Sequence, residues 1–154
     1  MRDHRKLVAF TKARELAVAV YRATSQFPRE EQFGLTSQIR RSAVSIPSNL
    51  VEGCARQSER DYLRFLDIAL GSACELEFQL DLARELGFLG DNEDLIELSH
   101  DVARLVSGLA NARRKALLQT PESLNHPGVI DPRSQKPEAR SQKPEARSLR
   151  TDQE

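Results

Sequence analysis

Apolar residues recur along most of the chain at spacings of three and four, the pattern of helices that bury one face. Four such segments are separated by helix-ending residues, namely residues 6–25, 31–55, 58–86 and 91–118. Pro28 ends the first segment, Ser58 is a favourable N-cap for the third, and Gly87 suits a left-handed C-cap. Because the connections are short, neighbouring helices must run antiparallel. The pattern predicts an all-α, up-down-up-down four-helix bundle over residues 1–120.

The second segment carries a proline inside its helical pattern. Its apolar stripe is Ile39, Ala43, Ile46 and Leu50. Pro47 has no backbone N–H, so the carbonyl four residues earlier loses its helical partner and the helix should bend there. Ser45, Ser48 and Asn49 flank the proline and could satisfy freed backbone groups. A proline inside a helix costs about 3 kcal/mol, which indicates a fixed packing role for this segment.

The sequence around this proline resembles the signature of a known family. The signature residues are Arg40, Arg41, Ser45, Pro47, Asn49, Glu52 and Gly53. With a second matching block over residues 65–87, the chain resembles the four-helix-bundle proteins encoded within intervening sequences of bacterial 23S ribosomal RNA genes. The resemblance covers residues 5–118. One departure is Phe10, at a position where this family usually has tryptophan.

The resemblance implies an up-down four-helix bundle that assembles as a ring-like homopentamer, and it implies no known catalysis. A related group, the accessory proteins of diversity-generating retroelements, shares the fold and binds a reverse transcriptase and nucleic acid. We therefore predict a non-enzymatic, self-assembling protein that acts as an assembly or adaptor platform. The alternative is a nucleic-acid-binding accessory protein for structured RNA or a reverse transcriptase.

The third segment is apolar on two sides. One face holds Tyr62, Leu66, Ala69, Ala73, Leu76 and Leu80. Ile68, Phe78 and Leu82 lie roughly opposite, and Gly71 on the same side would allow another backbone to approach closely. We predict that these four residues form a subunit interface. The alternative is a central helix that exposes a few apolar side chains within a single bundle.

The charge balance is neutral, with 23 Lys and Arg residues against 23 Asp and Glu residues. A neutral body argues against strong non-specific attraction to nucleic acid or to an anionic membrane. Five arginines nevertheless suggest a basic patch near the corner between the second and third helices: Arg40, Arg41, Arg56, Arg60 and Arg64. Repeated around a ring, this patch could contact phosphate backbones. The alternative is an ordinary solvated surface of ion pairs, with Glu52, Glu59 and Asp61 between the arginines.

The strongest enzyme-like pattern is Glu97 followed by His100, the spacing with which di-iron bundles present metal ligands. Such sites need a second copy of the pattern and further glutamates, and this chain has one copy. The helical wheel places both residues away from the core, so we predict a solvated helix face. We expect no metal or other cofactor, and a metal-dependent bundle enzyme is the third and least favoured function.

Two cysteines, Cys54 and Cys74, fall in consecutive antiparallel helices. Their distances from the connecting turn differ by about 20 Å at the rise of an α-helix, which is too far for a disulfide within the chain. We predict that both occupy packed positions as small residues. The alternative is a reactive or intersubunit thiol.

Residues 121–154 differ in composition from the rest of the chain. The seven residues 133–139 are repeated as 140–146, and each copy contains proline and almost no apolar side chain. We predict a disordered tail, whose repeat reflects DNA duplication or, alternatively, a peptide docking site. No apolar run approaches the roughly 20 residues that span a bilayer, so we predict a cytoplasmic protein without a membrane partner.

Overall fold

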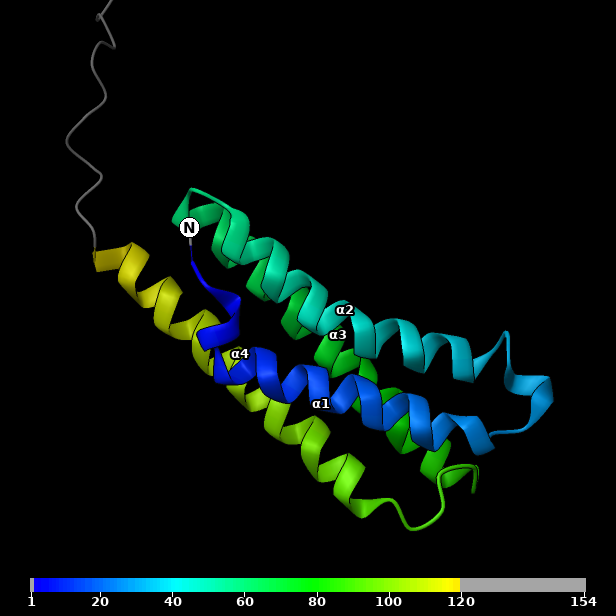
Figure 1. The fold of residues 1–154 in the computed structure, drawn as a ribbon. Coiled ribbons are helices and arrows are strands. Elements are labelled where there is room, and N and C mark those ends of the chain that lie inside the picture. Colours follow the sequence, from blue (N-terminus) through cyan, green and yellow to red (C-terminus); the bar gives the residue numbers. More distant parts are fainter. Residues whose placement is uncertain (1, 120–154) are drawn as a thin grey trace, which may run out of the picture. The chain divides into compact units, whose positions relative to one another are not determined.

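The computed structural model describes residues 2–119, and the predicted tail lies outside these described residues. Four α-helices make up most of the described part of the chain, which contains no strand (Figure 1). They are α1 (Val8–Ala23), α2 (Leu35–Ala55), α3 (Glu59–Glu85) and α4 (Glu93–Gln119). The all-α prediction is confirmed.

Each helix runs antiparallel to the next, because short connections leave no room for a crossover (Figure 1). α1 packs against α2 and α4, and α3 packs against the same two helices. α1 and α3 therefore occupy diagonal corners of the bundle. The core between the helices includes the predicted inner face of α3, whose residues are each at most 1% exposed: Tyr62, Leu66, Ala69, Ala73, Leu76 and Leu80.

The ends of α3 confirm the predicted capping residues. Ser58 Oγ accepts a hydrogen bond from the backbone N–H of Asp61 at 3.0 Å. Gly87 follows the helix with φ +75°, the left-handed conformation that glycine adopts most readily. These two local signals position the long α3 between its neighbours.

The predicted start of α2 at residue 31 is wrong. Residues Arg29–Glu31 form a separate short 3-10 helix, and α2 begins only after Gly34. The Glu31 carboxylate accepts a hydrogen bond from the backbone N–H of Leu35 at 2.9 Å, so this side chain satisfies a donor in the first turn of α2. Glu31 therefore acts from outside the helix that was predicted to contain it.

α2 continues as one α-helix through Pro47. Ser48 Oγ donates to the carbonyl of Val44 at 2.8 Å, and Asn49 Nδ2 donates to the carbonyl of Ser45 at 2.8 Å. Both carbonyls lie in the turn that a proline loosens, because the ring pushes against the preceding turn. These side chains thus bond backbone carbonyls beside Pro47, but neither bonds the carbonyl of Ala43, which is the one that the proline frees. The predicted satisfaction of the freed group is therefore not confirmed, and a bend at this residue stays a prediction.

Candidate functional site on the motif helix and its neighbours

The signature residues Ser45 and Asn49 form a polar network between α2 and α3. Asn49 Nδ2 lies 3.0 Å from Ser45 Oγ, and Ser45 Oγ lies 2.8 Å from Ser72 Oγ on α3. Ser72 Oγ in turn donates to the carbonyl of Ile68 at 3.1 Å. If Asn49 donates to Ser45 and Ser45 donates to Ser72, each of the two hydroxyls accepts one hydrogen bond and donates another. The signature therefore joins two helices in this structure.

The signature glycine, Gly53, lies on α2 directly against side chains of α3. A Cβ atom at this position would lie 2.9 Å from Phe65 Cβ and 3.2 Å from Tyr62 Cδ2. Real Cβ atoms do not approach that closely, so only glycine fits without moving a helix. Its neighbour Glu52 is ion-paired with Arg56 at the end of α2.

Arg40 and Arg41 lie in the first half of α2 and are already engaged with neighbouring helices. Arg40 Nε donates to Thr24 Oγ1 at 2.8 Å, and its guanidinium lies 4.9 Å from the Tyr21 ring centroid. Arg41 Nη2 lies 3.3 Å from a carboxylate oxygen of Glu75 on α3. Both arginines therefore tie α2 to its neighbours.

The five candidate arginines do not form one patch, so that part of the prediction is wrong. Arg40 and Arg56 are separated by 16 residues of sequence, which is about 24 Å along a helix. Arg56, Arg60 and Arg64 alone lie at the corner between α2 and α3. The prediction failed because it grouped residues by sequence, while α2 is long enough to carry its two ends to opposite regions of the bundle.

Cations from distant segments gather at this corner instead. Arg2 Nη1 donates to the carbonyl of Arg56 at 3.0 Å, and Arg114 Nη2 lies 2.7 Å from an Asp67 carboxylate oxygen. We call this region the basic end, and its cations are Arg2, Arg5, Lys6, Arg56, Arg60, Arg64, Arg113, Arg114 and Lys115. Figure 1 shows the first residues beside the α2–α3 connection and the end of α4 at the same end of the bundle.

Carboxylates at the basic end are fewer than its cations: Asp3, Glu52, Glu59, Asp61 and Asp67. The opposite end holds the α1–α2 connection, the end of α3 and the start of α4. We call this the acidic end, because carboxylates outnumber its cations Arg22, Arg29 and Arg84 there: Glu30, Glu31, Asp81, Glu85, Asp91, Glu93, Asp94 and Glu97. The zero net charge therefore hides a separation of charge along the bundle, which composition alone could not reveal.

A buried tyrosine organises part of the basic end. The Tyr62 ring has the guanidinium of Arg2 at 4.4 Å and that of Arg113 at 5.8 Å from its centroid. Arg2 lies near the start of the chain, whereas Arg113 lies near the end of α4. Their contact joins residues more than a hundred positions apart, so no local pattern could have found it.

The two cysteines have opposite environments, so the prediction that both are packed is half wrong. Cys54 is buried and Cys74 is exposed. Burial raises the pKa of the Cys54 thiol above 9.0, against a smaller lowering by its hydrogen bond with Tyr62. Burial likewise raises the pKa of the Tyr62 hydroxyl above 10.0. Neutral forms of both groups are therefore favoured at this helix crossing.

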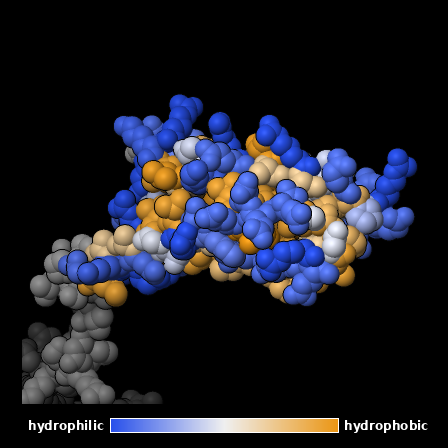
Figure 2. Space-filling model, turned by 90° about the horizontal axis from the view of Figure 1, so that it is seen from below, coloured by the Kyte–Doolittle hydropathy of each residue, from blue (hydrophilic) through white to orange (hydrophobic). Residues whose placement is uncertain are grey.

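The predicted interface residues lie on the outer side of α3. Phe78 is 66% exposed and Ile68 is 42% exposed, while Leu82 is half-buried. No atom lies within 4 Å of a Cβ built on Gly71, so nothing within the chain approaches it closely. Figure 2 shows that hydrophobic side chains reach the surface among hydrophilic ones on one face of the bundle. The second apolar face of α3 is thus exposed in the single chain.

Glu97 and His100 are both exposed on α4, as the helical wheel predicted. His100 lines an open groove between α3 and α4 together with Cys74 and Glu77. No group of three or more His, Cys, Asp and Glu residues could hold a metal ion in the part of the chain that the structure describes. Among helices of that part, none is long and apolar enough to cross a membrane.

Comparisons with known proteins assign the chain to a family. A family model described as 23S rRNA-intervening sequence protein matches residues 5–111. The chain belongs to the family of 23S rRNA-intervening sequence proteins. The matched region begins before α1 and ends within α4, so it includes the α2–α3 network, the outer side of α3 and the α2–α3 corner, but not Arg2, Arg113, Arg114 and Lys115 of the basic end.

A solved relative of this 23S rRNA-intervening sequence protein comes from Bacteroides thetaiotaomicron. It is described as a protein of unknown function from the S23 ribosomal protein family. The two chains are 27% identical with a TM-score of 0.62, over 68% of this chain and 96% of the relative. No curated protein matches the chain.

Proposed function

We propose that this protein is a non-enzymatic, cytoplasmic four-helix bundle that assembles into a homopentamer and serves as an assembly or adaptor platform. The exposed apolar face of α3 carries this proposal. Exposed apolar side chains of this kind favour contact with another protein. The number of five subunits comes from the family resemblance.

Phe78 is the clearest member of this face. Fully burying a phenylalanine side chain stabilises an association by about 1.5–3 kcal/mol, and here two-thirds of the residue is exposed. Ile68 lies ten residues earlier on the same side of α3, and Gly71 between them leaves room for a partner backbone. Large apolar side chains gathered on one helix face mark interaction sites more often than isolated ones do.

Native mass, measured by light scattering after size exclusion, tests the proposal. Five copies of the 17.4 kDa chain have a mass of about 87 kDa, which we expect for the wild type. Phe78→Glu should lower that mass while helicity is retained, because a carboxylate would be buried in the interface. Phe33→Glu is the matched control, since Phe33 is 90% exposed but lies in the connection before α2. A wild-type mass of 17.4 kDa would contradict the proposal.

We propose nucleic-acid binding at the basic end as the second candidate function, with structured RNA as the ligand. The observation that favours it is the excess of cations over carboxylates at that end. In a ring whose axis runs along the bundles, every basic end would lie on the same rim. A single rim of positive charge of this kind suits a phosphate backbone. A reverse transcriptase partner remains a proposal from the family resemblance.

Fluorescence anisotropy with a labelled structured RNA tests this candidate. Binding should weaken by more than tenfold between about 50 and 200 mM salt, because phosphate contacts release counterions. Replacing Arg60 and Arg64 by alanine should weaken binding and reduce that salt dependence. Arg84→Ala is the control, because Arg84 lies at the acidic end. Equal affinities for all three proteins, or no binding at low salt, would rule this candidate out.

A further inference from the structure

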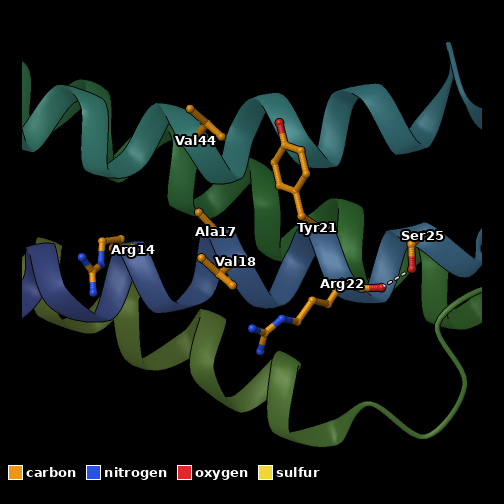
Figure 3. Close-up of a pocket in the computed structure, with 7 residues that line it drawn as sticks. All are labelled: Arg14, Ala17, Val18, Tyr21, Arg22, Ser25 and Val44. Atoms are coloured by element: carbon orange, nitrogen blue, oxygen red, sulfur yellow. Dashed lines mark hydrogen bonds between the residues drawn. The ribbon is translucent and has the colours of Figure 1, made fainter.

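A groove runs between α1 and α2 on the outside of the bundle. It has a volume of about 580 Å³, and Figure 3 shows the residues that line it: Arg14, Ala17, Val18, Tyr21, Arg22, Ser25 and Val44. Val18, Tyr21 and Val44 are 47%, 48% and 42% exposed. The groove therefore has an apolar floor that no part of the described chain covers.

Cations surround this floor. Figure 3 shows Arg14 and Arg22 on either side of Val18, while Tyr21 reaches from α1 toward α2. Arg40 adds its guanidinium beside the Tyr21 ring. Within the described part of the chain, no carboxylate lines the groove. An apolar floor with a cationic edge fits a partner surface that is apolar with carboxylates around it.

The outer side of α3 has that composition. Phe78 projects from it, and Glu75, Asp81 and Glu85 lie three or seven residues away, on the same side or beside it. Helix periodicity places Ile68 on this side as well. The chain thus carries both halves of a complementary contact, one on α3 and the other between α1 and α2.

We propose that Phe78 of one copy inserts into the α1–α2 groove of the next copy, so that the subunits join head to tail. This inference rests on the self-assembly proposed above and names the two surfaces that meet. Aromatic anchors that fill a pocket dominate many protein interfaces. Glu75, which lies three residues before Phe78, then comes closest to Arg22 of the neighbour.

The levels of the two surfaces along the bundle agree. Arg40 contacts Tyr21 and Thr24, and the next residue, Arg41, contacts Glu75, so Glu75 lies within about one helical turn of the level of Tyr21 and Thr24. Phe78 is three residues beyond Glu75, which is about 4.5 Å along α3. α1 runs parallel to α3, so Phe78 lies near the level of the turn from Tyr21 to Ser25.

The similar levels of Phe78 and the groove matter because of cyclic symmetry. Copies related by rotation about an axis along the bundle remain at one level, so Phe78 meets the groove without a shift along the axis. Its side chain also leans toward the N-terminus of its helix, which brings the ring toward Tyr21. The contact therefore needs no sliding of one subunit past another.

Like surfaces do not fit each other as well. Two grooves face to face would bring Arg14 and Arg22 against their own copies, and two α3 surfaces would bring carboxylates together. The head-to-tail contact avoids both repulsions. Because α3 packs against α2 and α4, its outer side and the α1–α2 groove do not point in opposite directions. Each contact therefore turns the next subunit, which favours a closed ring over a straight filament.

Mixing two interface variants tests the pairing directly. Val18→Glu places a carboxylate in the groove and leaves the outer side of α3 unchanged. Phe78→Glu alters the outer side of α3 and leaves the groove unchanged. Each variant alone should have the 17.4 kDa mass of a single chain. An equal mixture should form one intact contact and stop at two copies, with a mass of about 35 kDa. Circular dichroism on each sample confirms that the helices remain folded.

Val8→Glu is the matched control for the groove, because Val8 is 64% exposed on α1 but does not line the groove. It should keep the wild-type mass. A wild-type monomer would overturn the proposed function itself. An oligomeric wild type with an oligomeric Val18→Glu variant, or a mixture that stays at 17.4 kDa, would overturn the pairing and leave self-assembly standing.

Discussion

Ser45 and Ser72 join α2 to α3 through a hydrogen bond of 2.8 Å between their hydroxyl oxygens. The bond lies within two residues of Pro47, where α2 lacks one backbone donor. Asn49 donates to the same Ser45 hydroxyl, so the side chains near the proline also bind the neighbouring helix. The polar residues around Pro47 thus combine backbone support with contact between helices.

Ser45→Ala should lower the free energy of unfolding by about 1 kcal/mol, because Ser72 and Asn49 both lose a partner. Urea denaturation at one fixed protein concentration measures the change, since self-association makes stability depend on concentration. Ser42→Ala on the same helix is the control. The Ser42 hydroxyl is buried without a partner, so its removal should leave stability unchanged or increase it. Equal losses in the two variants would contradict the role of the network.

Gly53→Ala should destabilise the protein by about 1–3 kcal/mol, because the added methyl group would press on Phe65 and Tyr62. Gly108→Ala is the control in the interior of α4, where nothing lies within 4 Å of the added carbon. It should stabilise the protein by about 1 kcal/mol through helix propensity alone. Thermal unfolding of both variants at matched concentration measures the contrast. Stabilisation by both substitutions would show that α2 and α3 separate easily at Gly53.

Local signals were enough to predict four helices, apart from the start of α2, and the two faces of α3. The Ser58 cap and the left-handed Gly87 depend on neighbours within a few residues. The exposure of Ile68 and Phe78 follows from helical periodicity, since a residue opposite the core has no other helix of the chain beside it. Such features depend on residues that are close together in the sequence, and the structure confirms them.

Features that depend on where helices meet could not be predicted in the same way. The basic end forms only because the start of the chain, the α2–α3 corner and the end of α4 lie side by side. The contacts of Tyr62 with Arg2 and Arg113 show this arrangement. The exposure of Cys74 likewise depends on the width of the groove between α3 and α4. Sequence spacing fixes neither the relative levels nor the rotations of packed helices.

The two thiols should react at very different rates at neutral pH. Cys74 is exposed, whereas Cys54 is buried and burial raises its pKa, so little reactive thiolate forms there. A colorimetric thiol reagent should modify one cysteine per folded chain quickly and the second only after denaturation. In Cys74→Ser the fast phase should disappear. Persistence of a fast phase in that variant would show that Cys54 is accessible.

Alkaline pH should destabilise the fold through Cys54 and Tyr62. Burial raises the pKa of both groups in the folded protein above their ordinary values of 9.0 and 10.0. The folded state therefore holds these protons more tightly, and the free energy of unfolding falls as pH rises through the ordinary values toward the folded ones. Urea denaturation between about pH 8 and about pH 10.5 measures this fall. Cys54→Ala should show a shallower fall than the wild type, even if its stability at neutral pH is lower, while Cys74→Ala should show the wild-type slope. An unchanged slope in Cys54→Ala would mean that the buried thiol does not contribute to the alkaline transition.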